Sequence, residues 1–490
     1  MRLGLLEQSD SMESRDVIVV GSGPAALRAA IACADGGVVP LIIDEFGVSS
    51  ASGSTPVAGI AASIDEVDPS SHIDDTITAA GEDCSEKAAT RICKEAVSTL
   101  AELERWGLVL RRREGGLPHA STIPGHTTAR VTGCGESTVR EVTKVLEEQA
   151  IKRGIQRNTD NLPISLVSDN NQVRGLIVLN IITGEILPIQ AKAVILATEG
   201  YQGLWSSSSE GPGTGNHLAI SVGIAPSGME RVPKHPLSTG DFGIHIPLDV
   251  LGGGGRIRRE NGEDVGPEEV LDGEPCILDL RAIDSETSIW FRQTASRIKE
   301  RIGIDITRDV VPISPRVAYT TGGTPCDEFG RAIFSGFTQE GLPSQLWFTG
   351  LYAAGRSSHS GMHGERPLAG NLLLEDLVSG KAAGEHASDW VLGEQFGGSE
   401  VIENSVREAS NRITSLKEDG GIPVGQFASK LSSAISLIPT SKDAALAEIR
   451  QIKETRISLT DHSSVMNTEM LEALRLEGLA SVAEAMIASE

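Results

Sequence analysis

A glycine-rich turn between an apolar run and a helical stretch constrains the fold of this chain more than any other feature. Residues 17–20 read Val-Ile-Val-Val, and the motif Gly-x-Gly-x-x-Ala follows at Gly21, Gly23 and Ala26. Gly21 permits the tight turn, Gly23 lets backbone N–H groups approach a pyrophosphate, and Ala26 keeps the helix close to the strand. An apolar strand that breaks into this motif and then into a helix is typical of a Rossmann-like dinucleotide site.

An acidic residue supports the same interpretation. Asp44 closes a second apolar run at 41–43, at about the separation from the turn at which such sites accept a hydrogen bond from a ribose hydroxyl. Pro24 and Ala25, inside the motif, belong to the same predicted site. The motif by itself leaves NAD, NADP and FAD open, and it also occurs as a tight turn without any ligand.

Composition and charge limit the other partners. The chain has 490 residues, and its 43 basic against 67 acidic residues leave a net charge of −24, which disfavours nucleic acid and anionic membrane. Its six cysteines show no Cys-x-x-Cys spacing and predict neither disulfides nor a metal or iron–sulfur centre. No basic segment precedes an apolar stretch at the start, and no apolar run reaches about eighteen residues. We therefore expect no signal peptide, no membrane span and a cytoplasmic location.

Motifs in the last third of the chain carry a resemblance to a known family. The stretch 350–355 reads Gly-Leu-Tyr-Ala-Ala-Gly, 361–364 reads Gly-Met-His-Gly, and 368–375 reads Leu-Ala-Gly-Asn-Leu-Leu-Leu-Glu. With the stretches at 191–198 and 302–331, they resemble the FAD-dependent oxidoreductase 2 family, in particular the flavoprotein subunits of succinate dehydrogenase and fumarate reductase, and L-aspartate oxidase. The resemblance follows the family's order over roughly the whole chain. It implies FAD and hydride transfer between a small organic acid and flavin N5.

The resemblance also implies an α/β fold in three parts. A Rossmann-like FAD-binding domain is expected over 14–234 and 313–390, interrupted by an α+β capping domain over 235–312. A C-terminal helical domain is expected over 395–490, because the apolar residues there follow a helical period. Asn467 is the predicted cap of its last helix.

The resemblance assigns a set of cofactor contacts to this chain. The start of the helix after Gly364 would point its N-terminus at the reduced flavin, with Asn371 facing the ring, unless this segment is only a tight turn that packs a helix. The histidine that binds FAD covalently in succinate dehydrogenase falls on Ser54, so FAD is expected to be non-covalent. The predicted cofactor-binding residues are Gly21, Gly23, Pro24, Ala25, Ala26, Asp44, Ser54, Thr55, Ala58, Gly59, Ala197, Thr198, Gly355, Arg356, Asn371, Leu372 and Leu373.

Departures from the family pattern gather where the substrate is expected. His235 stands in the family's substrate-contacting His-Pro-Thr, but Leu237 replaces the threonine. Ala318 occupies the place of a second substrate histidine, and the family's arginine after His-Gly-Ala-Asn falls on Pro367. Arg366 lies one position earlier. The residues that define dicarboxylate specificity in the family are therefore mostly replaced.

Two departures fall among the cofactor positions. The family's Ala-Thr-Gly-Gly reads Ala-Thr-Glu-Gly here, which introduces Glu199, and the glutamate that follows its Ala-Ala-Gly is Arg356. Buried charges of this kind can shift local pKa values by whole units. Arg356 near an anionic reduced flavin would favour reduction, or the two changes would mark a lost site.

Three hypotheses about function remain open. The chain is a divergent FAD-dependent oxidoreductase of a small organic acid, an electron-transfer subunit that docks an iron–sulfur partner, or a degenerate scaffold. The residues predicted to rebuild the substrate site in the first hypothesis are His235, His363 and Arg366, with one of Arg256, Arg258 or Arg259, which otherwise form a solvated hairpin.

Overall fold

The computed structural model describes residues 12–46, 58–66, 68–239, 243–338 and 340–488. Its main sheet has eight strands in the order β15-β16-β7-β8-β1-β2-β5, with β6 paired to β7 and β16 also paired to β8. These strands are β1 (Glu13–Val20), β2 (Leu41–Ile43), β5 (Gln156–Asn158), β6 (Asn161–Asp169), β7 (Gln172–Asn180), β8 (Ile186–Leu196), β15 (Arg331–Phe337) and β16 (Pro343–Ala353).

The centre of this sheet is parallel and positions the site. β1 pairs in parallel with β2 and β8, and β16 pairs in parallel with β8. The register places Val20 opposite both Ile43 and Leu196, and Leu196 opposite Ala353. The carboxyl ends of four strands therefore meet at one edge, where open α/β sheets bind their ligands.

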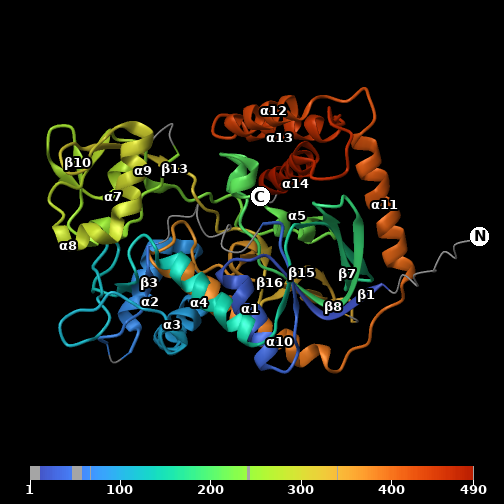
Figure 1. Ribbon diagram of the computed structural model, residues 1–490, viewed down its shortest axis with the longest axis horizontal. Helices are drawn as coiled ribbons and strands as arrows, with labels where there is room; N and C mark the ends of the chain where they lie inside the picture. Colours follow the sequence, from blue (N-terminus) through green and yellow to red (C-terminus); the bar gives the residue numbers. More distant parts are fainter. Residues whose placement is uncertain (1–11, 47–57, 67, 240–242, 339, 489–490) are drawn as a thin grey trace, which may run out of the picture.

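Helices cover one face of the sheet at close range (Figure 1). α1 (Pro24–Asp35) packs on α10 (Asn371–Val391), with α3 (Glu86–Trp106) and α4 (Thr138–Lys152) beside them. A Cβ at Gly384 of α10 would lie 2.2 Å from the Ala29 carbonyl oxygen. Glycine there lets the two helices approach until their backbones touch.

The capping domain is a separate α+β unit inserted between halves of the flavin domain, seen in yellow-green at upper left in Figure 1. Its antiparallel sheet has the order β11-β10-β12-β13-β9. Its elements are β9 (His235–Ser238), α6 (Asp249–Gly252), β10 (Arg256–Arg259), β11 (Asp264–Val265), α7 (Pro267–Leu271), β12 (Cys276–Asp279), α8 (Ser285–Ser288), α9 (Arg292–Ile302) and β13 (Val311–Arg316). The unit has its own apolar core around Leu278 and Val311, and the expected division at 312/313 falls within β13.

The last part of the chain is helical, as expected. α11 (Glu400–Leu416) lies on β6, β7 and β8, and α12 (Val424–Leu437), α13 (Lys442–Lys453) and α14 (Thr468–Ala488) form a bundle above it. Asn467 Oδ1 accepts a hydrogen bond from the Met470 N–H at 2.8 Å, which confirms the predicted cap. The α/β fold with FAD-binding and helical C-terminal domains is thus confirmed.

Short elements complete the described chain. They are β3 (Ile60–Ala61), α2 (Ser70–Ala80), β4 (Val131–Thr132), α5 (Thr214–Ser221), β14 (Thr324–Pro325) and β17 (Ser358–His359), with 3₁₀ turns η1 (Gly81–Asp83), η2 (Gln202–Leu204), η3 (Ser208–Glu210), η5 (Ile289–Phe291) and η6 (Gly355–Ser357). None of the helices in the described ranges is long and apolar enough to cross a bilayer.

Candidate cofactor and active site

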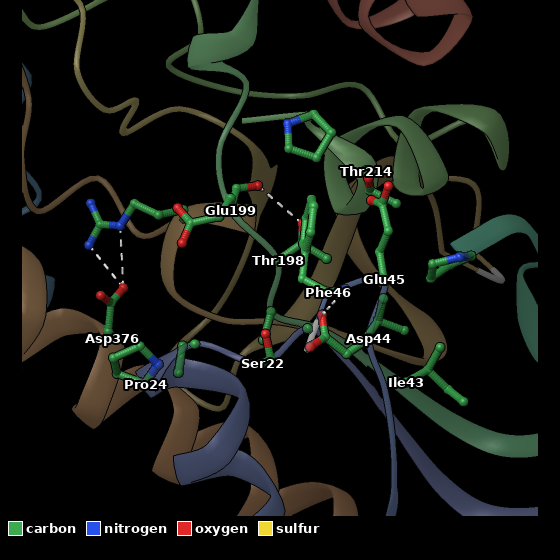
Figure 2. Close-up of a pocket in the computed structure, with 18 residues that line it drawn as sticks. Ser22, Pro24, Ile43, Asp44, Glu45, Phe46, Thr198, Glu199, Thr214 and Asp376 are labelled. Atoms are coloured by element: carbon green, nitrogen blue, oxygen red, sulfur yellow. Dashed lines mark hydrogen bonds and ion pairs between the residues drawn. The ribbon is translucent and has the colours of Figure 1, made fainter. Parts of the chain in front are cut away.

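A pocket opens where the four parallel strands end. The free space between its walls, open solvent included, is about 600 Å³. Each strand delivers its next residues to the pocket: Gly21 after β1, Asp44 after β2, Ala197 and Thr198 after β8, and Arg356 just beyond β16. Figure 2 shows these segments converging on one space. Remote stretches of sequence therefore form one site because the strand register aligns their ends.

Gly21 makes the turn that the sequence predicts. Its φ is +123°, and its N–H donates to the Ile43 carbonyl at 2.9 Å. A Cβ at Gly21 would lie 2.2 Å from the Ala197 carbonyl oxygen, whereas one at Gly23 would meet nothing within 4 Å. Gly23 precedes α1 and has no side chain to satisfy the first N–H groups of that helix. Those groups are free to bind an anion such as a pyrophosphate.

Asp44 presents an unsatisfied oxygen at the other end of the pocket. Its side chain is buried, and Oδ1 accepts from the Phe46 N–H at 3.2 Å. Oδ2 has no hydrogen-bond partner in the described part of the chain, although the Arg157 guanidinium lies 3.8 Å away. Burial raises the pKa of this carboxyl. A buried acceptor without a partner is unusual and fits a ribose hydroxyl.

The neighbouring Glu45 was not singled out by the sequence, yet it lines the same pocket. Arg475 of α14 donates through Nε to Glu45 Oε1 at 2.6 Å. Burial raises the pKa of Glu45, and the Arg475 charge opposes that rise. Only the fold reveals this pair, because its members are separated by 430 positions. The C-terminal helical domain thereby holds one residue of the pocket wall in place.

Arg356 lies buried at the opposite wall. Its guanidinium donates to the Leu372 carbonyl at 2.7 Å and to Asp376 Oδ1 at 3.0 Å, and Glu375 Oε2 is 3.7 Å away. Figure 2 shows Asp376 and Glu199 on this side of the pocket. Burial raises the pKa of Glu199 to about 7, and the charge of Asp376 adds to the rise. Both carboxylates are therefore close to a single cation.

His363 belongs to the same charged group. Its Nε2 lies 2.7 Å from Glu375 Oε2, and its Nδ1 has no partner among the described residues. Burial alone would raise the pKa of Glu375, but the His363 and Arg356 charges hold it at about 2. Ser360 also donates to this carboxylate. Glu375 is thus an ionised carboxylate that orients the histidine.

The three predicted catalytic residues are not joined by described contacts. His235 in β9 is buried, its Nε2 donates to the Ile246 carbonyl at 2.7 Å, and burial lowers its pKa to about 3. Arg366 is 49% exposed and lies 3.9 Å from Glu268 of the capping domain. The other candidate cations form ion pairs on a hairpin: Arg256 and Arg258 with Asp264, Arg258 with Asp279, and Arg259 with Glu263.

The residues expected beside the flavin ring lie around the start of α10 and do not line this pocket. Asn371 is buried, with its Oδ1 2.8 Å from His72 Nε2 and its Nδ2 donating to Thr76 Oγ1 at 2.9 Å. Burial lowers the pKa of His72 to about 4, so the neutral ring donates. The Asn371 amide is thereby held toward α2. Near this point are Leu372 and Leu373 in the first turn of α10, and Ala58 and Gly59 before β3.

Ser54 and Thr55 lie outside the described residues. Ala26 and Gly355 are next in sequence to the pocket-lining residues Ala25 and Arg356.

Sequence reasoning did not identify a buried polar cluster near the start of α10. Arg130 is fully buried and bonds Asp75, Ser71 and Thr128, and His126 lies 3.1 Å from it. His126 Nε2 is 2.9 Å from the Ala369 carbonyl. No local motif identifies this cluster, because its members come from the loop before β4 and from α2, more than fifty residues apart in sequence.

The described residues fit an FAD molecule. The pocket offers the unsatisfied N–H groups of α1 for a pyrophosphate and Asp44 Oδ2 for a ribose, and the glycine turn keeps side chains out of the space between them. When bound, FAD supplies a carrier that accepts or donates a hydride. Fold and pocket together define an α/β dinucleotide-binding protein with a capping domain.

Comparison with known proteins identifies the family. The family described as "FAD binding domain" matches residues 16–373, and "Fumarate reductase flavoprotein C-term" matches residues 440–490. The first match covers well over half of the chain, so the chain belongs to that family. It is an FAD-dependent oxidoreductase that resembles the flavoprotein subunits of fumarate reductase and succinate dehydrogenase. This confirms the resemblance seen in the sequence.

Individual relatives agree over nearly the whole length. The fumarate reductase flavoprotein subunits of Serratia sp. and Escherichia coli are 25% and 26% identical to this chain, over 96% of it and 86% and 85% of their own lengths. A solved structure of a mutant E. coli quinol fumarate reductase matches with a TM-score of 0.87 at 23% identity, covering 97% of this chain and 89% of that one. The two chains therefore share a fold. Nothing in these comparisons supports a degenerate scaffold.

Proposed function

We propose that this oxidoreductase acts on a small organic acid bound between the flavin domain and the capping domain. The observation that carries the proposal is a cleft of about 790 Å³ between the loop with Thr122 and His126 and the capping hairpin with Arg256. His126 in this cleft reaches Ala369, just before α10, by a hydrogen bond. A residue of the cleft wall is thus hydrogen-bonded to the segment where the resemblance expects the flavin ring. Relatives named fumarate reductase and succinate dehydrogenase support an organic acid as the substrate.

Within this proposal Arg366 binds the substrate carboxylate. Its partner Glu268 is 57% exposed and 3.9 Å away, so the pair is weak and a carboxylate could replace it. Exposed arginine side chains near a cleft are well suited to bidentate recognition of carboxylates.

His363 is the proposed site of proton exchange. Glu375 holds its Nε2, which leaves Nδ1 as the nitrogen able to gain or lose a proton. His235 is proposed to shape the site in its neutral form rather than to carry charge, because burial lowers its pKa to about 3. FAD is proposed to be non-covalent.

The first experiment is an absorbance spectrum of the purified protein before and after acid precipitation. We expect the bands of oxidised flavin, and we expect them to move to the supernatant because the cofactor is not covalently attached. Organic acids, beginning with succinate, fumarate and aspartate, are then screened for bleaching or reoxidation of the flavin. A flavin-loaded protein whose spectrum responds to none of a broad set of acids would contradict the proposed substrate class.

Arg366→Ala tests the clamp once a substrate is found. We expect KM to rise at least about tenfold, since one charge-assisted contact to the carboxylate is lost. Arg456→Ala is the matched control, because Arg456 is an exposed arginine paired with Glu418 in the C-terminal helical domain. Equal KM values for the two variants would remove Arg366 from the site.

We also propose that the chain passes electrons to a second subunit, such as an iron–sulfur protein, and that it works in the cytoplasm. Its relatives are named as subunits, which supports a partner. Its six cysteines are all free, which suits a reducing compartment. Purification of the tagged chain from its native cell tests this: a stoichiometric cysteine-rich partner is expected, and isolation of the chain alone would argue against it.

A further inference from the structure

The wall of the cofactor pocket near α1 carries more negative than positive groups. Among the described residues that line the pocket, Arg356 is the cation, and the acids are Asp44, Glu45, Glu199 and Asp376. Asp44 and Glu45 lie at the far end and have their own neighbouring arginines, Arg157 and Arg475. Glu199 and Asp376 therefore compete for Arg356.

Of these two acids, Arg356 forms hydrogen bonds and an ion pair with Asp376, not with Glu199. Asp376 Oδ1 accepts from Arg356 NH2 at 3.0 Å, and from its Nε at 3.3 Å. The same guanidinium also lies 3.7 Å from Glu375. Glu199 makes no ion pair with any described residue, and its hydrogen-bonding neighbour is the neutral Gln202. The Arg356 charge still lowers the pKa of Glu199, but Glu199 is the carboxyl on this wall that has no direct ion pair among the described residues.

A bound cofactor would increase the excess of negative charge on this wall of the pocket. A dinucleotide brings a doubly charged pyrophosphate to the start of α1, which lies in the same pocket as Glu199. Like charges at short range in a partly desolvated space favour protonation of the group that has no partner. Burial raises the pKa of Glu199 to about 7 before any ligand charge is added. A small further rise is enough to keep Glu199 neutral in the neutral pH range.

We propose that Glu199 binds FAD in its neutral, protonated form, so that the protein takes up one proton from solution at Glu199 when the cofactor enters. The proposal rests on FAD occupying this pocket. One O–H bond forms on the carboxylate, and no other bond changes. Protonated, Glu199 becomes a hydrogen-bond donor, which suits an anionic ligand better than a carboxylate does.

Burial also raises the pKa of Asp376, but the hydrogen bonds and charge of Arg356 oppose that rise. Glu375 keeps a pKa of about 2, and burial raises the pKa of Tyr319 to about 12. The charged groups that act on Glu199 are Arg356 of η6 and Asp376 of α10. Glu375 of α10, His363 before α10 and Tyr319 after β13 act on Arg356 or Asp376, and Asp44 and Glu45 after β2 line the same pocket.

The test measures binding of FAD to the apoprotein from about pH 6 to about pH 9. For the wild-type chain, Kd should rise by up to about tenfold per pH unit above about pH 7, because binding takes up a proton and the proton concentration falls as the pH rises. Calorimetry near pH 8 in two buffers of different ionisation enthalpy should show a net uptake of protons, up to about one per FAD. This second measurement needs no variant.

Glu199→Gln should bind FAD tightly with a Kd that no longer depends on pH, since the amide is neutral at every pH. Asp376→Asn is a second variant: it removes a negative neighbour and frees Arg356 for Glu199, so the rise in Kd should begin at lower pH. A flat wild-type profile or a slope retained in Glu199→Gln would each overturn the proposal. Failure to bind FAD at every pH would instead overturn the cofactor assignment itself.

Discussion

At the scale of single residues, the cofactor turn depends on two glycines with different tasks. Gly21 is held at a φ of +123°, which other residues rarely adopt, and its α-carbon faces the Ala197 carbonyl. Gly23 has an extended backbone with a φ of −76°, and open space lies where its Cβ would be. The first glycine is needed by the folded chain, and the second leaves room for a ligand.

Gly21→Ala and Gly23→Ala should therefore fail in different ways. Gly21→Ala should lower the free energy of unfolding by about 1 to 3 kcal/mol, since it combines backbone strain with a close contact. Gly23→Ala should change it by less than about 0.5 kcal/mol, yet weaken FAD binding because the methyl group enters the cofactor's space. Denaturant unfolding of the apoproteins and FAD titration separate the two. Equal loss of stability in both variants would contradict this division of tasks.

At the scale of secondary-structure elements, a contact across the domain boundary anchors the capping domain. Glu136 lies between β4 and α4 of the flavin domain, and its carboxylate accepts from the N–H groups of Gln293 and Thr294 at 2.5 and 2.6 Å. These are among the first N–H groups of α9 in the capping domain, and the residue before α9, Phe291, has no capping side chain. A carboxylate at a helix start also complements the helix dipole. Glu136 thus caps a helix of the neighbouring domain.

Glu136→Ala should loosen α9 and its attachment to the flavin domain. Loss of a cap typically costs about 1 kcal/mol, so hydrogen exchange at the first amides of α9 should become several-fold faster. Glu141→Ala is the control, because Glu141 lies nearby on α4 and contacts only Arg140 and Lys144 in the described part. If both variants leave exchange in α9 unchanged, the capping role of Glu136 is wrong.

At the scale of the whole molecule, the last helix of the chain holds a residue of the pocket wall. Residues 21 to 26 begin the site, and α14, more than four hundred residues later, supplies Arg475 to neutralise the buried Glu45. The cation also lies over the Phe46 ring, 5.5 Å from its centre. The C-terminal helices, in red in Figure 1, therefore take part in the site as well as in the core.

Arg475→Ala should destabilise the chain at neutral pH by about 3 to 5 kcal/mol, because it leaves a buried carboxylate without its cation. The loss should shrink as the pH falls, since burial already raises the pKa of Glu45 and protonation removes the unpaired charge. Arg412→Ala, which breaks the more exposed pair with Glu477, should cost less than about 1 kcal/mol. Thermal unfolding at two pH values distinguishes the variants, and a pH-independent loss in Arg475→Ala would contradict the explanation.

The turn at Gly21, the acid at Asp44 and the cap at Asn467 could be predicted from short stretches of sequence, because backbone conformation and helical or strand period are local properties. The long family motifs added the cofactor and the expected domain order. They also placed Asn371 beside the flavin ring, and the structure adds that His72 and Thr76 hold its amide, which no motif indicates.

The sequence by itself determined a Rossmann-like turn, since strand, turn and helix signals lie within short segments, and its long motifs carried the resemblance to FAD-dependent oxidoreductases. Only the tertiary structure decided how the charges of the site are shared. Glu199 and Arg356 were visible as departures, but Asp376 as the partner of Arg356 and Arg475 as the partner of Glu45 were not. The reason is physical: pKa values and ion pairs depend on distance through space and on burial, which the order of residues does not contain.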